Sequence, residues 1–204
     1  MNAKTAIHLR FPGKPVWILA MGFALAGCGG GPQPAIYVLG EPAAPTPAVT
    51  SEVGLPVVLV KPVEVPEYLD TTDLQERRGG EMIPSRTGRW GERLSVGITG
   101  ALAAALAPRL PRMAVTVPPP VERPALQVFV DVEEFEPRTE GPVIFVSRWT
   151  VMDGTARRAV MSERTSLIEP VAGTGDAERV AAMTNAIDRL AARIAAAIAR
   201  IYGT

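Results

Sequence analysis

Residues 126–134 read LQVFVDVEE, in which apolar and polar side chains alternate. This two-residue period predicts a β-strand with one buried face. Two more strands are predicted at residues 143–152 and 158–168, and Asp153-Gly154 between them is a strong signal for a tight hairpin. A turn at residues 137–142, which contains proline and glycine, separates the first strand from the second. The three segments therefore predict an antiparallel meander.

A helix is predicted on each side of this meander. After Arg89, large apolar residues recur at every fourth position up to about residue 107, where Pro108 ends the pattern. Residues 176–201 carry apolar side chains at spacings of three and four, which is typical of a long amphipathic helix. This order of elements fits a single α+β domain, in which two main helices pack on one face of a largely antiparallel sheet.

Shorter strands are predicted upstream of the first helix. Residues 55–61 form a β-branched run, and two further short strands are predicted near residues 74–78 and 81–84, separated by the turn signal Gly79-Gly80. Residues 62–73 are interrupted by prolines, so they are expected to form a loop or an irregular edge.

Cys28 is the only cysteine, and it follows an apolar segment near the N-terminus. Basic residues precede this segment, and Leu25-Ala26-Gly27 before the cysteine match a lipobox, the site where the thiol receives a diacylglyceryl group. Residues 16–26 make the segment 11 residues long, short of the roughly 20 needed to cross a bilayer. We therefore expect residues 1–27 to be a lipoprotein signal peptide and the acyl chains on Cys28 to hold the protein permanently to a membrane. Gly29 in place of aspartate after the cysteine favours the periplasmic face of the outer membrane, by analogy with Gram-negative sorting.

Residues 28–54 are rich in glycine and proline, a composition that favours extended chain, so we expect a tether. Within it, residues 36–39 are apolar enough to form a short strand that docks on the domain. The remaining residues, 55–204, have the length of one domain.

The composition of the mature chain excludes several functions. Without residues 1–27 the chain has 18 basic and 21 acidic residues, a formal charge of −3, so it lacks a basic field for nucleic acid. The only histidine, His8, is lost with the leader, so Ser-His and Cys-His nucleophile pairs cannot form. Zinc and copper sites would lack their usual ligands. We expect no enzymatic activity, no metal and no cofactor besides the covalent lipid on Cys28.

Some local patterns could still carry chemistry, although structural interpretations are favoured for each. An acidic cluster could act as a carboxylate pair or a calcium site, or simply lie on a solvated sheet face. Lys61 could pair with a serine, and Gly173-Thr174-Gly175 could bind phosphate at a helix start, or form a turn capped by Thr174 or Asp176. Alanines on the C-terminal helix leave a smooth flank that a second copy could cover, so a homo-oligomer stays open. The acidic cluster comprises Asp131, Glu133, Glu134 and Glu136.

Three motifs resemble those of the PqiC-like family of ABC-type transport auxiliary lipoproteins. Residues 62–70, PVEVPEYLD, are similar to the family's PV-x-(L/V)-P-x-YLD motif. Residues 89–94, RWGERL, resemble its RWAEPL at the start of the first helix, and residues 130–136, VDVEEFE, resemble its VDV-x-x-FE strand. The chain departs from the family at residues 71–72 and 91–93, where the family often has Arg-Pro and Ala-Glu-Pro.

The resemblance implies a non-enzymatic outer-membrane lipoprotein subunit of a transport system built on mammalian-cell-entry (Mce) domain proteins. Such systems move lipids between the inner and outer membranes and support envelope integrity. The implied partners are the membrane and an Mce-domain protein, and the alternative is a structural lipoprotein of envelope assembly. The candidate partner-facing or structural residues are Pro62, Pro66, Tyr68, Leu69, Asp70, Arg89, Trp90 and Glu92.

Overall fold

The computed structural model describes residues 33–40, 54–120 and 122–202. The predicted signal peptide, Cys28 and most of the predicted tether lie outside these residues. From Pro34 onward the chain forms one compact unit. Its elements are, in chain order, β1 (Ala35–Tyr37), β2 (Val57–Val60), β3 (Asp73–Arg78), β4 (Glu81–Trp90), α1 (Leu94–Leu106), the 3₁₀ helix η1 (Ala107–Arg109), β5 (Ala114–Thr116), β6 (Leu126–Pro137), β7 (Val143–Asp153), β8 (Ala159–Glu169) and α2 (Asp176–Tyr202).

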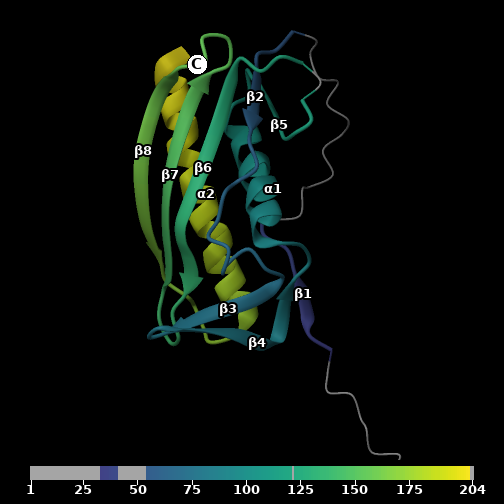
Figure 1. Ribbon diagram of the computed structural model, residues 1–204, viewed down its shortest axis with the longest axis vertical. Coiled ribbons are helices and arrows are strands. Elements are labelled where there is room, and N and C mark those ends of the chain that lie inside the picture. The colour runs from purple at the N-terminus through teal and green to yellow at the C-terminus, as the bar shows by residue number, and fades with distance from the viewer. Residues whose placement is uncertain (1–32, 41–53, 121, 203–204) are drawn as a thin grey trace, which may run out of the picture. The chain divides into compact units, whose positions relative to one another are not determined.

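The larger sheet has five strands in the order β5-β2-β6-β7-β8. Strands β6, β7 and β8 form the predicted antiparallel meander (Figure 1). Strand β2 runs parallel to both β5 and β6, which makes the sheet mixed. The three residues of β5 have too little pattern to be predicted as a strand, and their pairing with β2 stabilises them.

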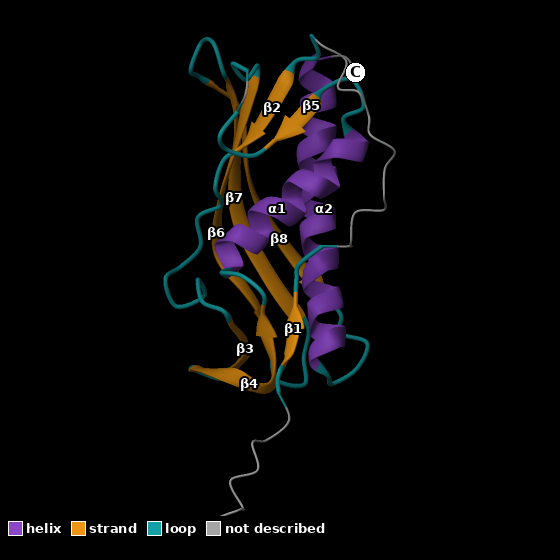
Figure 2. Ribbon diagram, turned by 90° about the vertical axis from the view of Figure 1, so that its right-hand side faces the viewer, coloured by secondary structure: helices purple, strands orange, loops and turns teal. Residues whose placement is uncertain are grey.

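The two α-helices lie on one side of the larger sheet (Figure 2), as predicted. Helix α2 packs along β7 and β8, and α1 lies beside β2 and β5 and packs against α2. The core between the helices and the larger sheet contains the predicted apolar face of β6. It also contains Phe145 and Trp149 from β7, and all of these side chains are buried. The indole N–H of Trp149 donates to the Thr165 hydroxyl at 3.0 Å, so its polar group is satisfied inside the core. A single α+β domain is confirmed.

A smaller sheet, in the order β1-β4-β3, lies at one end of this domain (Figure 1). Strands β3 and β4 form a hairpin that turns at Gly79-Gly80, as predicted. Strand β1 is the predicted docking strand, and it pairs parallel with Gly88–Trp90 of β4. Strand β4 is longer than predicted because β1 supplies hydrogen-bond partners to its second half. Trp90 therefore ends a strand, and helix α1 begins only at Leu94.

Candidate functional site

The loop between β2 and β3, residues 62–72, carries the first motif, and we call it the YLD loop. Its first half runs alongside β6, where the N–H of Glu64 donates to the carbonyl of Val130 at 3.0 Å. On its other side, the N–H of the buried Val63 donates to the hydroxyl of Thr99 in α1 at 2.9 Å. The loop is therefore held between the main sheet and a helix even though its prolines prevent a regular strand.

The second half of the loop is a turn that sends three consecutive side chains in different directions. The N–H of Leu69 donates to the carbonyl of Pro66 at 2.9 Å and closes the turn. The side chain of Leu69 enters the core, that of Tyr68 is exposed, and that of Asp70 reaches the start of α1. The motif thus anchors the loop, presents an aromatic ring and supports a helix.

The carboxylate of Asp70 accepts a free backbone N–H in the first turn of α1, which contains no acidic residue of its own. Its Oδ1 accepts the N–H of Ser95 at 3.1 Å, and its Oδ2 accepts Nε and Nη2 of Arg93 at 2.9 and 2.6 Å. A carboxylate at this position stabilises a helix because it satisfies a free N–H and faces the positive end of the helix dipole. Burial opposes ionisation, but the hydrogen bonds from Arg93 and Ser95 outweigh it and lower the pKa of Asp70.

We expect Asp70→Ala to lower the free energy of unfolding by about 1 kcal/mol at pH 7, the usual value of a helix cap. Because the pKa of Asp70 is lower in the folded state, its contribution is complete above the unfolded pKa of about 3.9 and is lost as the pH falls through the folded value. Urea denaturation at pH 7, 5 and 3 measures this difference. Asp73→Ala is the control, because Asp73 and its partner Arg89 are both well exposed. Equal losses for the two variants would show that Asp70 is not a cap.

The exposed ring of Tyr68 is held by a partly buried ion pair. Glu136 is only 1 % exposed and pairs with Nε of Arg77 from β3, and its Oε2 accepts the Tyr68 hydroxyl at 3.3 Å. The Arg77 guanidinium also lies 5.8 Å from the centroid of the Tyr68 ring, within cation–π range. Burial, and then the charge of Glu136, raise the pKa of Tyr68, so the phenol stays protonated and donates.

A β-bulge between Val132 and Glu134 brings Glu136 to this position. Without the bulge, the two-residue period would place Phe135 outside the core and Glu136 inside it. With it, Phe135 is buried against Phe145 with ring centroids 5.0 Å apart, and Glu136 faces the YLD loop. Two consecutive acidic residues, Glu133 and Glu134, interrupt the alternation and were the available signal for this bulge.

A surface cleft of about 240 Å³ lies beside Tyr68 and is lined mainly by charged side chains. Its carboxylates are paired: Glu134 binds Arg138, and Glu133 binds Arg164 at 2.7 Å. Within the residues that the structure describes, no group of three or more histidine, cysteine or acidic side chains is arranged to hold a metal. The cleft therefore offers paired charges and hydrogen-bonding groups. The lining residues are Tyr68, Arg77, Gly79, Glu133, Glu134 and Arg138.

The eight predicted site residues come from the first two motifs and differ in exposure, and the structure brings all three motifs together around the YLD loop. Trp90 is 6 % exposed and its side chain lies in the apolar core, while its backbone N–H donates to the carbonyl of Thr72 at 2.9 Å. Pro62, Tyr68, Arg89 and Glu92 are exposed, Pro66 and Asp70 are half-buried, and Leu69 and Trp90 are buried.

The remaining sequence candidates lie apart from this cluster. The Lys61 ammonium lies 6.0 Å from the Phe129 ring centroid, a cation–π contact on the outer sheet face. The acidic side chain of Glu178 folds back over Gly173 and Gly175, where it would repel a bound phosphate. Neither arrangement resembles a catalytic or phosphate site.

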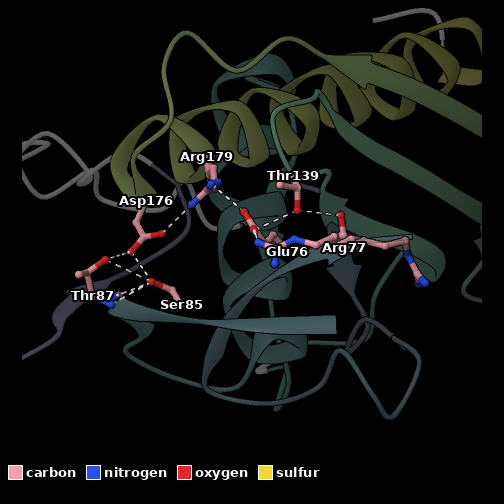
Figure 3. Close-up of polar contacts among 9 residues, drawn as sticks. Glu76, Arg77, Ser85, Thr87, Thr139, Asp176 and Arg179 are labelled. Atoms are coloured by element: carbon pink, nitrogen blue, oxygen red, sulfur yellow. Dashed lines mark hydrogen bonds and ion pairs between the residues drawn. The ribbon is translucent and has the colours of Figure 1, made fainter. Parts of the chain in front are cut away.

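A polar junction fastens the small sheet to the start of α2 (Figure 3). The buried Asp176 carboxylate accepts the hydroxyls of Ser85 and Thr87 from β4 at 2.6 and 2.8 Å. Arg179 bridges Oδ1 of Asp176 at 3.2 Å and Oε2 of Glu76 in β3 at 2.7 Å. From the sequence, Asp176 was predicted only as a helix cap, because its partners in β4 lie about 90 residues away in the chain.

The same junction reaches the turn between β6 and β7. The hydroxyl of Thr139 donates to Oε1 of Glu76 at 3.0 Å, and its N–H donates to the Arg77 carbonyl at 3.0 Å (Figure 3). Glu76 and Arg77 are adjacent, so one strand supports both the junction and the Tyr68 cluster. These contacts join the small sheet both to α2 and to the turn between β6 and β7.

The sequence profile of the ABC-type transport auxiliary lipoprotein component family matches residues 37–195. This protein belongs to that family. The match spans the YLD loop, the junction and most of α2, and it confirms the resemblance carried by the three motifs. No curated protein sequence matches the chain.

Two solved structures share the fold of this auxiliary lipoprotein. A crystal structure of an uncharacterized protein has a TM-score of 0.64 at 21% identity, and the match covers 70% of this chain and 92% of that one. Protein XCC0632 from Xanthomonas campestris, assigned to DUF330, has a TM-score of 0.62 at 18% identity, with 84% and 97% covered. At these identities the similarity shows the fold alone.

Proposed function

We propose that this auxiliary lipoprotein is a non-enzymatic subunit of an Mce-type ABC transport system. In this proposal, the lipid on Cys28 holds it to the periplasmic face of the outer membrane. There it contacts an Mce-domain protein and supports lipid traffic between the two membranes. The family membership and the three motifs support the transport role, and the absence of imidazole from the mature sequence favours binding over catalysis.

The observation that carries the proposal is the fixed presentation of Tyr68. Tyr68 is 43 % exposed, yet three contacts hold it in place. Its hydroxyl donates to Glu136, the Arg77 guanidinium lies over its ring, and the turn closed by the N–H of Leu69 fixes its backbone. Tyrosine and arginine are enriched where proteins bind one another, and a side chain that is already ordered loses little entropy on binding. A family motif that orders an exposed aromatic ring is therefore well suited to partner recognition.

We expect Tyr68→Ala to reduce recovery of the Mce-domain partner at least tenfold, because central aromatic contacts contribute about 2 kcal/mol or more to binding. The acylated protein is purified from membranes in mild detergent, and the proteins that co-purify are identified by mass spectrometry. Thermal unfolding should change little, since the ring is substantially exposed.

Tyr202→Ala is the matched control. Tyr202 is 41 % exposed and ends α2, outside the three motifs, so its replacement should leave recovery unchanged. Equal recovery with Tyr68→Ala and wild type would remove Tyr68 from the interface. If the wild-type protein recovers envelope-assembly proteins and no transport component, the structural lipoprotein alternative holds.

A further inference from the structure

Two of the most exposed aliphatic side chains in the described part of the chain lie side by side, one on β1 and one directly after it. Ile36 is 65 % exposed and Val38 is 60 % exposed. Both lie over Gly91, where a Cβ would stand only 3.2 Å from Ile36 and 3.4 Å from Val38. The intervening Tyr37 packs against the core instead. We call Ile36 and Val38 the apolar ridge.

The ridge is fixed on the domain at the point where the chain leads back to Cys28. Strand β1 pairs with β4 in the register Ile36↔Arg89, and the N–H of Gly91 donates to the Tyr37 carbonyl at 2.7 Å. Only eight residue steps separate Cys28 from Ile36, so the two cannot be more than about 29 Å apart. Most of the predicted tether therefore follows β1, and the part before it is short.

The geometry points to a lipid surface as the occupant of the ridge: Ile36 and Val38 contact the membrane that holds the anchor. This inference rests on the proposed acylation of Cys28. Because the segment between the two residues can span no more than about 29 Å, the ridge has a millimolar or higher effective concentration at that membrane. Transfer of two aliphatic side chains from water then favours the contact by a factor of about 100 or more.

The charges around the ridge suit lipid headgroups. Arg89 lies beside Ile36 in the sheet register, and Arg93 and Arg86 are also exposed. Arg89 pairs with Asp73, and this surface pair is weak enough for a phosphate to replace the carboxylate, whereas Arg93 is held by the half-buried Asp70. Exposed Glu92 nearby limits the net positive charge. An apolar edge bordered by arginines is the composition of an interfacial membrane contact.

The contact would orient the domain. The small sheet lies at the membrane, and the junction of Asp176 with β4 places the start of α2 beside it (Figures 1 and 3). Helix α2 has 27 residues, so its far end stands about 40 Å along the helix axis from that start. The anchor alone would permit any orientation, whereas the anchor and ridge together select one.

The test measures which surface is close to lipid. Cys28 is the only cysteine, and acylation consumes its thiol, so an introduced cysteine can be labelled selectively. Acylated Ile36→Cys protein carries an environment-sensitive fluorophore and is reconstituted into vesicles of phosphatidylethanolamine and phosphatidylglycerol in a 3:1 ratio, with or without brominated lipid. Ile168→Cys is the matched control, because Ile168 is 62 % exposed on β8 in the larger sheet.

We expect brominated lipid to quench the label at position 36 at least threefold more than the label at position 168. If the protein floats with the vesicles but the labels at positions 36 and 168 are quenched equally, the ridge contact would be overturned and the anchor would remain intact. Protein that does not float with vesicles would overturn both the anchor and the contact. A label at position 36 that is shielded in detergent, with the mass of a dimer, would show that a second copy occupies the ridge and would also overturn the membrane contact.

Discussion

Trp90→Ala is expected to lower the free energy of unfolding by about 3–5 kcal/mol, the usual cost of removing a buried tryptophan. Trp90 ends β4 with 6 % of its surface exposed, and its side chain belongs to the main apolar core. Its backbone is held by the Thr72 carbonyl on one side and by β1 on the other. Urea denaturation monitored by circular dichroism measures the loss of stability without relying on tryptophan fluorescence.

Phe129→Ala is the control for removing an aromatic side chain. Phe129 is 36 % exposed on the outer face of β6, so its loss should cost less than about 1 kcal/mol. Trp90→Phe should fall between the two because it retains part of the buried area. Stability close to wild type in Trp90→Ala, with binding of the partner selectively lost, would identify Trp90 as a partner contact and contradict its placement in the core.

The different environments of Trp90 and Tyr68 show which parts of the fold can be predicted from the sequence. The meander and α2 were predicted because periods of two and of three to four residues report which face is buried. Trp90 was placed at a helix start because the apolar period of α1 begins close behind it. Strand β4 instead continues to Trp90 because it pairs with β1, which lies more than 50 residues earlier.

The candidate site was predicted in pieces and could not be assembled from the sequence. The sequence indicates Tyr68, Asp70 and Glu136 separately, but their proximity depends on the YLD loop lying along β6 and on the bulge that turns Glu136 toward that loop. The sequence does not indicate Arg77, because an arginine in a polar strand has no distinctive pattern. Contacts between segments that are distant in the sequence depend on the fold, so local periodicity does not predict them.

Gly88→Ala is expected to lower the free energy of unfolding by about 2–3 kcal/mol, because it overpacks the junction between the small sheet and α2. A Cβ on Gly88 would lie 2.6 Å from Oδ2 of Asp176 and 2.8 Å from Cε2 of Tyr37. Asp176 cannot simply move away, because the same oxygen accepts the hydroxyls of Ser85 and Thr87. The strain should loosen β1, and limited proteolysis near residue 40 should accelerate.

Gly100→Ala is the matched control, with the same added methyl group and the opposite expected sign. Gly100 lies within α1, and a Cβ there would have no neighbour within 4 Å. Alanine is a better helix former than glycine, so this variant should be more stable than wild type by about 0.5–1 kcal/mol. A loss from Gly100→Ala equal to that from Gly88→Ala would mean that close packing at the junction is not the cause.

A double-mutant cycle between Gly88 and Asp176 separates steric strain from the loss of polar contacts. Asp176→Ala alone removes the acceptor of two hydroxyls and one ion pair, and should cost about 1–3 kcal/mol. In the double variant the methyl group added at position 88 no longer meets a carboxylate, so the combined loss should be smaller than the sum by about 1 kcal/mol. The contact with Tyr37 persists, so the relief is incomplete. Strict additivity would place the strain at Tyr37 and β1.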